Sequence, residues 1–376
     1  MRFVIFCHSI LSCWNHGNAH FLRGIARELI ERGHEVKVYE PADGWSRTNL
    51  IRDHGEASLV QAAALVPGLR IFSYRSHSVD TEEALEGADV VLVHEWTDAD
   101  LVNRIGSQRS AGGSFVLFFH DTHHRAITAP HEIQCFDLSG YDGVLAFGEV
   151  LREVYEAHGW GRRAFTWHEA ADWSLFNPKE QREKDLDLIW IGNWGDNERD
   201  RELHEYLIGP AVKLELKTRI HGVRYPAEIV DRLGKVGIDH AGWIPNHFVP
   251  QAFARSRVTM HIPRRAYVEA LPGIPTIRIF EALACGIPLV CAPWNDAENL
   301  FPRECYLHAA NGNKMCSALT LLLSDDALAA ELVGNGLAAI HNRHTCAHRV
   351  DELFAILHNI DCARALHVST DEVIAA

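Results

Sequence analysis

One acidic side chain stands out because its neighbours along a predicted helix are almost all apolar. Glu281 lies within the stretch 277–283, which otherwise carries isoleucine, phenylalanine, alanine and leucine apart from Arg278. A buried carboxylate is costly unless something hydrogen-bonds it. A pair of ribose hydroxyl groups would satisfy Glu281, and so would a narrow solvated face or an ion pair with Arg278. The sequence therefore predicts a ligand-binding carboxylate, with both structural alternatives open.

The loop before this helix has the composition of an anion site. It contains Pro272, Gly273 and Pro275, so it cannot be helical, and Pro275 suits the first helical turn. An exposed helix start presents free N–H groups and the positive end of the helix dipole, which can hold a diphosphate. Glycine lets a phosphate approach the backbone closely. We therefore predict a diphosphate site at Gly273, Ile274, Pro275 and Thr276.

Arginines at other predicted strand ends are candidates for the same anion. Arg264 and Arg265 follow a strand that ends near Pro263, and their guanidinium groups match phosphate oxygens. A solvated pair on a loop is the alternative. Arg199 follows a glycine-containing turn and is predicted to reach phosphate, although a tight turn with a capped helix explains the segment equally well.

The densest polar segment of the N-terminal half directly follows an apolar run. It contains His120, Asp121, His123, His124 and Arg125. The histidine spacing matches no common zinc pattern, so we predict a sugar site and no metal. His120 or Asp121 would accept a proton from an acceptor hydroxyl or bind the transferred sugar. Arg125 would bind an anionic group or pair with Asp121. A strand end with solvated histidines is the alternative.

A second polar segment follows another apolar run in the same half. His94 and Trp96 come directly after the strand predicted at 90–93. They are predicted to line an acceptor cleft, where the indole of Trp96 offers a stacking face for a sugar ring.

Two doubly wound α/β domains would position these residues. Short apolar runs alternate with amphipathic helical patterns in both halves, which is typical of parallel sheets covered on both faces. Ligands bind at the carboxyl ends of such strands. A polar, proline-containing joint near 168–182 separates the halves. We predict an N-terminal domain at 1–170, a C-terminal domain at 171–345, and a final helix and tail at 346–376 that packs back on the first domain.

Composition excludes several classes of protein. The 376 residues are 47% hydrophobic and 23% charged, as in globular proteins. Acidic residues outnumber basic ones by 50 to 36, which argues against a nucleic-acid partner. No apolar run approaches the roughly 20 residues of a spanning helix, and residues 2–9 are interpreted as a first buried strand rather than a signal peptide. The nine cysteines form no C-x-x-C pair, which favours buried thiols in the cytoplasm.

Residues 271–290 resemble the donor-binding signature of GT-B glycosyltransferases, in the broad group that includes the retaining group-1 enzymes and the CgeB-like spore-maturation proteins. The similarity extends to 242–263, to the linker at 172–178, and to 16–18 and 27–36. It therefore covers most of the chain. The resemblance implies two Rossmann-like domains that face each other across a cleft. It also implies a nucleoside diphosphate sugar as co-substrate, a hydroxyl acceptor and no protein-bound metal or other cofactor.

The resemblance also implies roles for single residues. Glu281 would hold the donor ribose as the second acid of the family's E-x7-E pair, whereas Gly273 stands where that pair has its first acid. Trp243 would lie at the nucleobase, where a packing role is the alternative, and His221 would line the same pocket. Gly17 would face the donor phosphates from the opposite domain, or serve as a plain turn glycine.

Two other functions fit the same architecture. A nucleotide-sugar 2-epimerase would bind the same donor and need no acceptor. A catalytically degenerate relative would serve as a binding or coat protein, because fold alone does not decide function. Binding of a nucleotide sugar separates the two enzymes from the coat protein.

Overall fold

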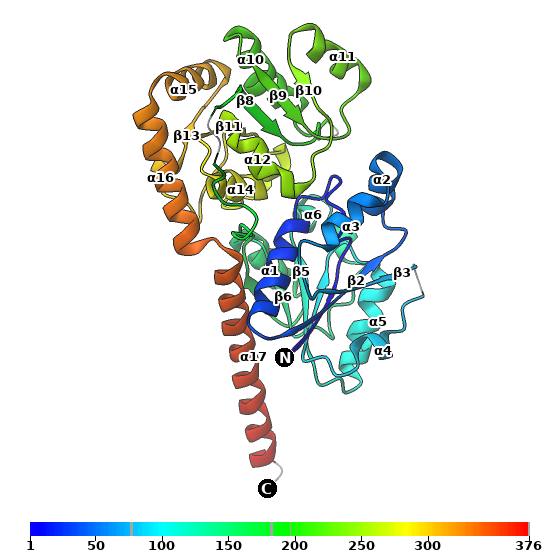
Figure 1. The fold of residues 1–376 in the computed structure, drawn as a ribbon. Helices are drawn as coiled ribbons and strands as arrows, with labels where there is room; N and C mark the ends of the chain where they lie inside the picture. Colours follow the sequence, from blue (N-terminus) through cyan, green and yellow to red (C-terminus); the bar gives the residue numbers. More distant parts are fainter. Residues whose placement is uncertain (76–77, 181–182, 196, 375–376) are drawn as a thin grey trace.

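The computed structural model describes residues 1–75, 78–180, 183–195 and 197–374, with side chains as far as Ile360. The chain forms two α/β domains, each built on a wholly parallel sheet with helices on both faces (Figure 1). The predicted fold class, a GT-B arrangement of two Rossmann-like domains, is confirmed. The carboxyl ends of the two sheets face each other, which places the strand-end loops of both domains in one region.

The N-terminal sheet has the strand order β3-β2-β1-β4-β5-β6-β7. Its central strands are buried on both faces, which explains why they appear in the sequence as continuous apolar runs. The strands are β1 (Arg2–Phe6), β2 (Glu35–Pro41), β3 (Arg70–Tyr74), β4 (Val90–His94), β5 (Val116–Asp121), β6 (Gly143–Ala146) and β7 (Ala164–Thr166). The helices are α1 (Ala19–Glu31), α2 (Trp45–His54), α3 (Ala57–Ala63), α4 (Thr81–Leu85), α5 (Ala99–Ser110), α6 (Arg125–Thr128), α7 (Pro130–Ile133) and α8 (Glu149–His158).

Two strands of this sheet end later than the sequence predicts. His94 belongs to β4, and His120 and Asp121 belong to β5, instead of following those strands. Parallel pairing explains the difference, because His120 and Asp121 pair with the last two residues of β6. The ladder thus continues through residues that their polarity alone assigns to a loop.

The C-terminal sheet has the order β10-β9-β8-β11-β12-β13. Its strands are β8 (Leu186–Ile191), β9 (Thr218–His221), β10 (Asp239–His240), β11 (Ser256–His261), β12 (Leu289–Cys291) and β13 (Leu307–His308). Its helices are α9 (Asp200–Glu202), the π-helical η1 (Leu203–Ile208), α10 (Gly209–Lys213), α11 (Ala227–Lys235), α12 (Val249–Ala254), α13 (Arg265–Ala270), α14 (Ile277–Cys285), α15 (Gly312–Ser324) and α16 (Asp326–Arg343), with 3₁₀ turns η2 (Asn246–Phe248) and η3 (Arg303–Cys305).

Helix α14 begins two residues later than predicted. Thr276 is its N-cap residue, so Pro275 lies outside the first turn. The loop before α14 is not part of the helix and is bonded to the segment after β12, since Gly273 N–H donates to the carbonyl of Asn295 at 2.7 Å. The helix ends at Gly286 in the left-handed conformation, with φ of 66°, as a C-cap glycine should.

The chain crosses between the domains twice, and the two crossings lie side by side. Ala171 N–H donates to His344 O at 2.9 Å, and Cys346 N–H donates back to Ala171 O at 3.0 Å. The last helix, α17 (Cys346–Ile374), then runs along α1 (Figure 1), where Arg32 pairs with Asp351 at 2.6 Å. The predicted domain boundaries stay a prediction, and residues 375–376 of the predicted tail lie outside the described residues.

Within the part of the chain that the structure describes, no helix is both long and apolar enough to span a bilayer. Of the eight cysteines whose side chains are described, all are free thiols and six are buried. The side chain of Cys362 lies outside the described residues.

We expect Gly24→Ala to destabilise the contact between α1 and the two crossings. A Cβ atom at Gly24 would lie 2.5 Å from Cys346 Sγ and 2.8 Å from Asp172 Cβ. Overpacking of this kind costs about 1–3 kcal/mol. Denaturant unfolding would measure the loss.

The matched control is Gly234→Ala in α11. Gly234 is exposed, and a Cβ atom there meets nothing within 4 Å among the described residues. Alanine in this helix should stabilise by about 0.5–1 kcal/mol. Equal effects of the two substitutions would contradict the close packing at Gly24.

Candidate functional site

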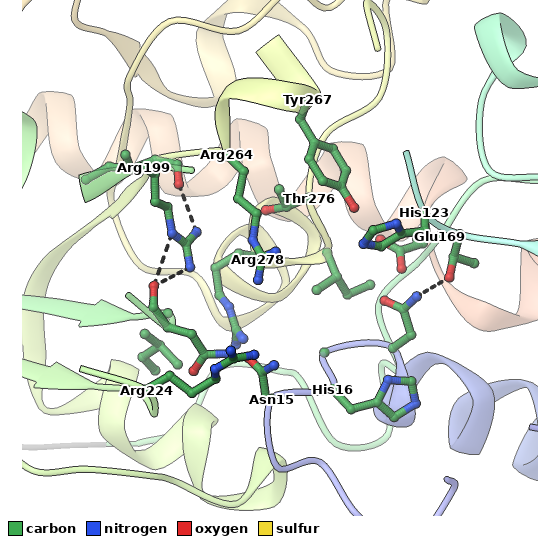
Figure 2. A pocket seen from close by; sticks show the side chains of 18 of the residues that line it. Asn15, His16, His123, Glu169, Arg199, Arg224, Arg264, Tyr267, Thr276 and Arg278 are labelled. Atoms are coloured by element: carbon green, nitrogen blue, oxygen red, sulfur yellow. Dashed lines mark hydrogen bonds between the residues drawn. The ribbon is translucent and has the colours of Figure 1, made fainter. Parts of the chain in front are cut away.

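The facing strand ends enclose a cavity of about 530 Å³ between the domains (Figure 2). Loops after β1, β4 and β5 contribute one wall. The ends of β8 and β11, the segment 264–267 and the start of α14 contribute the other. The position agrees with the rule that parallel α/β sheets bind ligands outside their carboxyl ends.

The C-terminal wall of the cavity carries a concentration of positive charge. Arg199, Arg224, Arg264 and Arg278 all line it. Among the described residues, Glu169 is the single carboxylic acid that lines the same cavity. Guanidinium groups bind phosphate oxygens through paired N–H donors, so this wall is suited to a ligand with several negative charges.

Neighbouring protein atoms hold three of these arginines in place. Arg199 donates to the carbonyl oxygens of Asn193 at 3.1 Å and Ile262 at 3.2 Å. Burial lowers the pKa of Arg199 to about 10, which leaves it charged at neutral pH. Arg264 pairs with Glu198 at 2.9 Å, and Arg278 pairs with Glu281. A ligand therefore meets guanidinium groups that are already oriented.

The amino end of α14 opens on this cationic wall. Thr276 and Ile277 line the cavity. The Thr276 side chain makes no capping hydrogen bond, and its hydroxyl instead lies 3.1 Å from His261 Nε2. The first N–H groups and the positive dipole end of a nine-residue helix thus add to the field of the arginines.

The other residues predicted for the diphosphate loop do not line the cavity. Gly273 has its N–H bonded to Asn295, and the Ile274 side chain packs against Gly148 of the N-terminal domain. Arg265 points to the carboxylates of Asp200 and Glu202 instead. Of the predicted loop, Thr276 alone reaches the cavity, and donor contacts by Gly273, Ile274, Pro275 and Arg265 stay predictions.

Glu281 lies behind the cavity wall, fully buried between the two domains. One carboxylate oxygen pairs with Arg278, and Oε1 lies 3.0 Å from Nδ1 of His20 on α1. This contact lacks hydrogen-bond geometry, so Oε1 has no hydrogen-bond donor among the described residues. The alternative of an ion pair with Arg278 is therefore present, and ribose binding by Glu281 stays a prediction.

A smaller pocket of about 50 Å³ continues the cavity between the domains. It shares Gly17 and Arg278 with the main cavity and reaches His221 and Trp243, the two residues predicted near the nucleobase. The Trp243 ring lies 4.5 Å from the ring of His54 on α2. Arg278 therefore lies where the two pockets meet.

The N-terminal wall approaches α14 closely at Gly17. A Cβ atom there would lie 3.1 Å from Cγ2 of Ile277, closer than an ordinary van der Waals contact, so glycine lets the two walls approach closely. Gly17 thus lies next to Ile277 at the start of α14, and its predicted contact with the donor phosphates stays a prediction.

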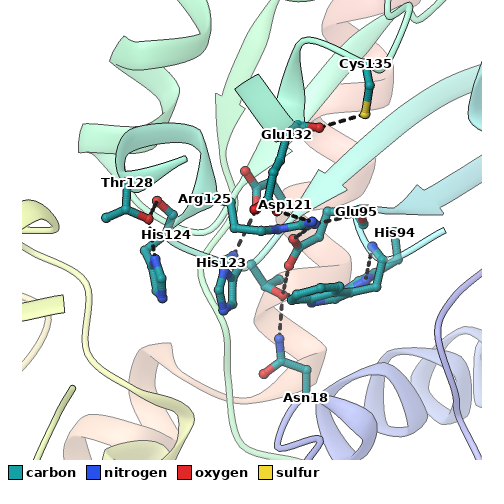
Figure 3. Close-up of polar contacts among 12 residues, drawn as sticks. Asn18, His94, Glu95, Asp121, His123, His124, Arg125, Thr128, Glu132 and Cys135 are labelled. Atoms are coloured by element: carbon teal, nitrogen blue, oxygen red, sulfur yellow. Dashed lines mark hydrogen bonds and ion pairs between the residues drawn. The ribbon is translucent and has the colours of Figure 1, made fainter. Parts of the chain in front are cut away.

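The polar segments after β4 and β5 form one network behind the N-terminal wall (Figure 3). Arg125 pairs with Glu95 at 2.6 Å and lies 3.9 Å from the centre of the Trp96 ring. Thr122 Oγ1 lies 3.2 Å from His94 Nε2. Of the three residues predicted to bind acceptor, Trp96 lines the cavity, whereas His94 and Arg125 support it. Arg125 pairs with Glu95 and Glu132, and no ion pair with Asp121 is found among the described residues.

The two residues predicted as catalytic also lie behind this wall. Asp121 accepts a hydrogen bond from the backbone N–H of His123 at 2.9 Å and from the Tyr155 hydroxyl at 2.8 Å. His120 is buried against Trp167, and burial lowers its pKa to about 3. Neither lines the cavity, so their catalytic role stays a prediction. The ring that does reach the cavity from this segment is that of His123.

Several cavity residues were not singled out from the sequence. Glu169 belongs to the predicted linker. Arg224 follows the short strand β9 and Tyr267 lies in the six-residue helix α13, and neither segment has a sequence pattern that indicates a ligand site. Arg278 was noted only as a partner for Glu281. Among the described residues, no group of three or more histidine, cysteine, aspartate or glutamate side chains could hold a metal ion.

Comparison with protein families gives a match to the second half of the chain. A family model described as glycosyl transferase-like matches residues 199–355. These residues include β9–β13, α14 and the cationic wall from Arg199 to Arg278. No curated protein matches the sequence significantly.

Solved structures with the same fold span nearly the whole chain. Sucrose-phosphate synthase of Thermosynechococcus elongatus has a TM-score of 0.65 and 15% identity, over 96% of this chain and 99% of its own. HepE of Anabaena, in complex with UDP and glucose, has a TM-score of 0.65 and 14% identity, over 96% of this chain and 100% of its own. A mutant of TarM from S. aureus, in a complex that contains UDP, has a TM-score of 0.67 and 8% identity, over 94% of this chain and 99% of its own.

At these identities the structural likeness shows the fold alone. The family match and the GT-B fold together support a glycosyltransferase. They do not confirm the CgeB-like group to which the sequence was compared.

We expect the cavity histidines to lower the free energy of unfolding as the pH drops through about 6.5. Glu95, Asp121 and Glu169, whose pKa burial raises, contribute in the opposite direction. Burial lowers the pKa of four cavity histidines, to about 4 for His8, about 3 for His16 and His261, and about 2 for His123. Because the unfolded chain takes up these protons near pH 6.5 and the folded protein does not, each of these histidines favours unfolding in acid. Each such group costs about 1.4 kcal/mol between pH 7.5 and 5.5.

Urea unfolding at pH 7.5 and 5.5 would measure the change in the free energy of unfolding between the two pH values. Relative to the parent protein, His123→Asn should be about 1 kcal/mol more stable at pH 5.5 than the change in the parent protein allows, whereas His131→Asn at an exposed site should change as the parent does. A pH-dependent change in His123→Asn equal to that of the parent would show that the His123 ring is protonated in the folded protein.

Proposed function

We propose that this protein transfers a glycosyl group from a nucleoside diphosphate sugar to a hydroxyl acceptor. The observation that carries the proposal is the cationic wall of the interdomain cavity, formed by Arg264, Arg278 and the amino end of α14. The glycosyl transferase-like match over 199–355 supports it, because that region supplies this wall.

In this proposal the diphosphate lies against the start of α14. Arg264 and Arg278 neutralise its oxygens, and the N–H groups after Thr276 point at it. Negative charge grows on the diphosphate as the bond to the sugar breaks. Donors fixed in advance at that position stabilise the transition state more than the ground state.

The nucleoside would extend into the smaller pocket toward His221 and Trp243. Glu281 would bind the ribose hydroxyls through Oε1, the oxygen that lacks a hydrogen bond. His20 belongs to the N-terminal domain and Glu281 to the other, so domain opening would separate them and expose this oxygen. Nucleotide entry would therefore precede closure.

The sugar and the acceptor would lie toward the N-terminal wall, near His123 and Trp96. Trp96 would stack on a sugar ring. Asp121 would act through His123, whose backbone N–H it holds, and His94 and Arg125 would support the same wall. A direct proton transfer to His120 would require movement of this wall, because the ring is buried.

We expect Arg264→Gln to weaken the binding of UDP about 10–100-fold, because a charge-assisted hydrogen bond to phosphate contributes about 1.5–3 kcal/mol. UDP is the probe because several proteins with the same fold have been solved with it. Isothermal titration calorimetry would measure the dissociation constants.

Arg265→Gln is the matched control, since Arg265 is adjacent in sequence and does not line the cavity. Its affinity for UDP should equal that of the parent protein. An equal loss in both variants would point to a general effect of charge rather than to a phosphate contact at Arg264.

Product analysis would separate transfer from epimerisation. A transferase should release UDP and attach the sugar to the acceptor. A 2-epimerase should instead yield a sugar with inverted configuration at C2, either still linked to the nucleotide or free, and no glycosylated acceptor. Binding of UDP, GDP, ADP and dTDP should be tested first by thermal shift. If none of them binds at millimolar concentration, both enzymatic functions fail and the binding or coat protein remains.

A further inference from the structure

Glu169 is a buried carboxylic acid whose side chain has no hydrogen-bond or ion-pair partner among the described residues. It is 4% exposed and lines the interdomain cavity on the side of His123 (Figure 2). Its carboxyl group makes no hydrogen bond or ion pair with any residue that the structure describes. A buried carboxyl group without such a partner is costly, so its presence in the cavity points to a ligand group that forms a hydrogen bond with it.

The backbone around Glu169 is held firmly. Arg349 of α17 donates from Nε to the Glu169 carbonyl at 3.3 Å, and the indole N–H of Trp167 donates to the Arg349 carbonyl at 2.8 Å. Glu169 thus lies on the first crossing between the domains, and the helix that follows the second crossing fixes it. Its carboxyl group is directed into the cavity from a rigid support.

We propose that Glu169 is the catalytic base, which takes the proton of the acceptor hydroxyl when the sugar is transferred. This inference rests on the proposed function and assigns a residue to its chemical step. Within the described residues Glu169 is the one acid that lines the cavity, whereas Asp121 is engaged by His123 and Tyr155 behind the wall.

The step balances without a further reactant. The acceptor oxygen forms a bond to the anomeric carbon while the bond from that carbon to the phosphate oxygen breaks. The electron pair of the broken bond leaves with the diphosphate, next to Arg264 and the start of α14. The hydroxyl proton passes to the carboxylate of Glu169. Because one base activates a direct attack from the face opposite the leaving group, the anomeric configuration inverts.

The surroundings of Glu169 favour its protonated form, as is needed for a group that takes up a proton. Burial raises the pKa of Glu169 well above its usual range, the negative charges of Glu281 and Glu95 raise it further, and Arg278 opposes them. Tyr267 also lines the cavity, and burial, followed by the charge of Glu169, raises the pKa of its hydroxyl. A carboxylate with a raised pKa is a stronger proton acceptor than an ordinary one.

The test compares Glu169→Gln with the parent protein. UDP release from UDP-glucose and UDP-N-acetylglucosamine would be measured with water and with a panel of simple glycosides as acceptors, and UDP affinity by calorimetry. We expect Glu169→Gln to bind UDP as the parent does and to lose about 10²–10⁴-fold in kcat. In the parent protein kcat should rise with pH, and this rise should be absent from Glu169→Gln. NMR should show that the product of the parent protein has the inverted anomeric configuration.

Glu298→Gln is the control for loss of a carboxylate at the same crossing. Glu298 contacts His168 at 2.7 Å and the Glu149 N–H at 2.8 Å and does not line the cavity. It should keep the parent rate. His120→Asn tests the competing base predicted from the sequence.

The outcomes separate the two proposals. Parent-like turnover in Glu169→Gln, a retained anomeric configuration, or loss of the rise of kcat with pH in His120→Asn alone would each overturn the role of Glu169 and leave glycosyl transfer standing. If the parent protein binds UDP and releases none from any donor, both the transfer and the base fail. If UDP and the other nucleotides do not bind at all, the proposed function itself is wrong.

Discussion

The buried contact between Arg278, Glu281 and His20 links the charge of the cavity to the closure of the two domains. Arg278 lines both pockets and is held by Glu281, which in turn lies against His20 of the opposite domain. Removing one member of such a group leaves another charge buried without compensation, which is expensive. The closed arrangement and the oriented guanidinium group therefore depend on each other, and a ligand that binds Arg278 also acts on the interface.

The loops around this contact show which part of the site was predictable. Continuous apolar runs identified the strands, and the strand-end rule brought Gly17, Trp96, Arg264 and Thr276 correctly to one region. Which side chain of a segment faces the cavity was harder to predict. β6 extends the pairing of β5 through Asp121, so His120 stays inside the sheet and His123 reaches the cavity instead. The length of a strand depends on its neighbour, which a local pattern does not contain.

Glu169 shows a limit of another kind. Its segment is polar and lies next to a proline-containing stretch, so composition alone identifies it as a linker. Its burial arises from two domains and from α17, which begins 177 residues later in the sequence than Glu169, at Cys346. Arg224 likewise reaches the cavity from a loop whose residues have no helical or strand period. Sites between domains depend on contacts between residues far apart in the sequence. The composition and periodicity of a short stretch of sequence do not reveal such contacts.

The cavity is divided electrostatically in a way that follows from burial. Its C-terminal wall holds permanent cations, because arginine stays protonated even where burial lowers the pKa of Arg199. On its N-terminal wall, burial lowers the pKa of His8, His16 and His123, which leaves neutral rings. A ligand with one highly charged end and one uncharged, hydroxyl-rich end would lie in a single orientation across these walls. Nucleoside diphosphate sugars have this asymmetry, and the orientation would bring the bond between sugar and phosphate to the boundary between the two walls.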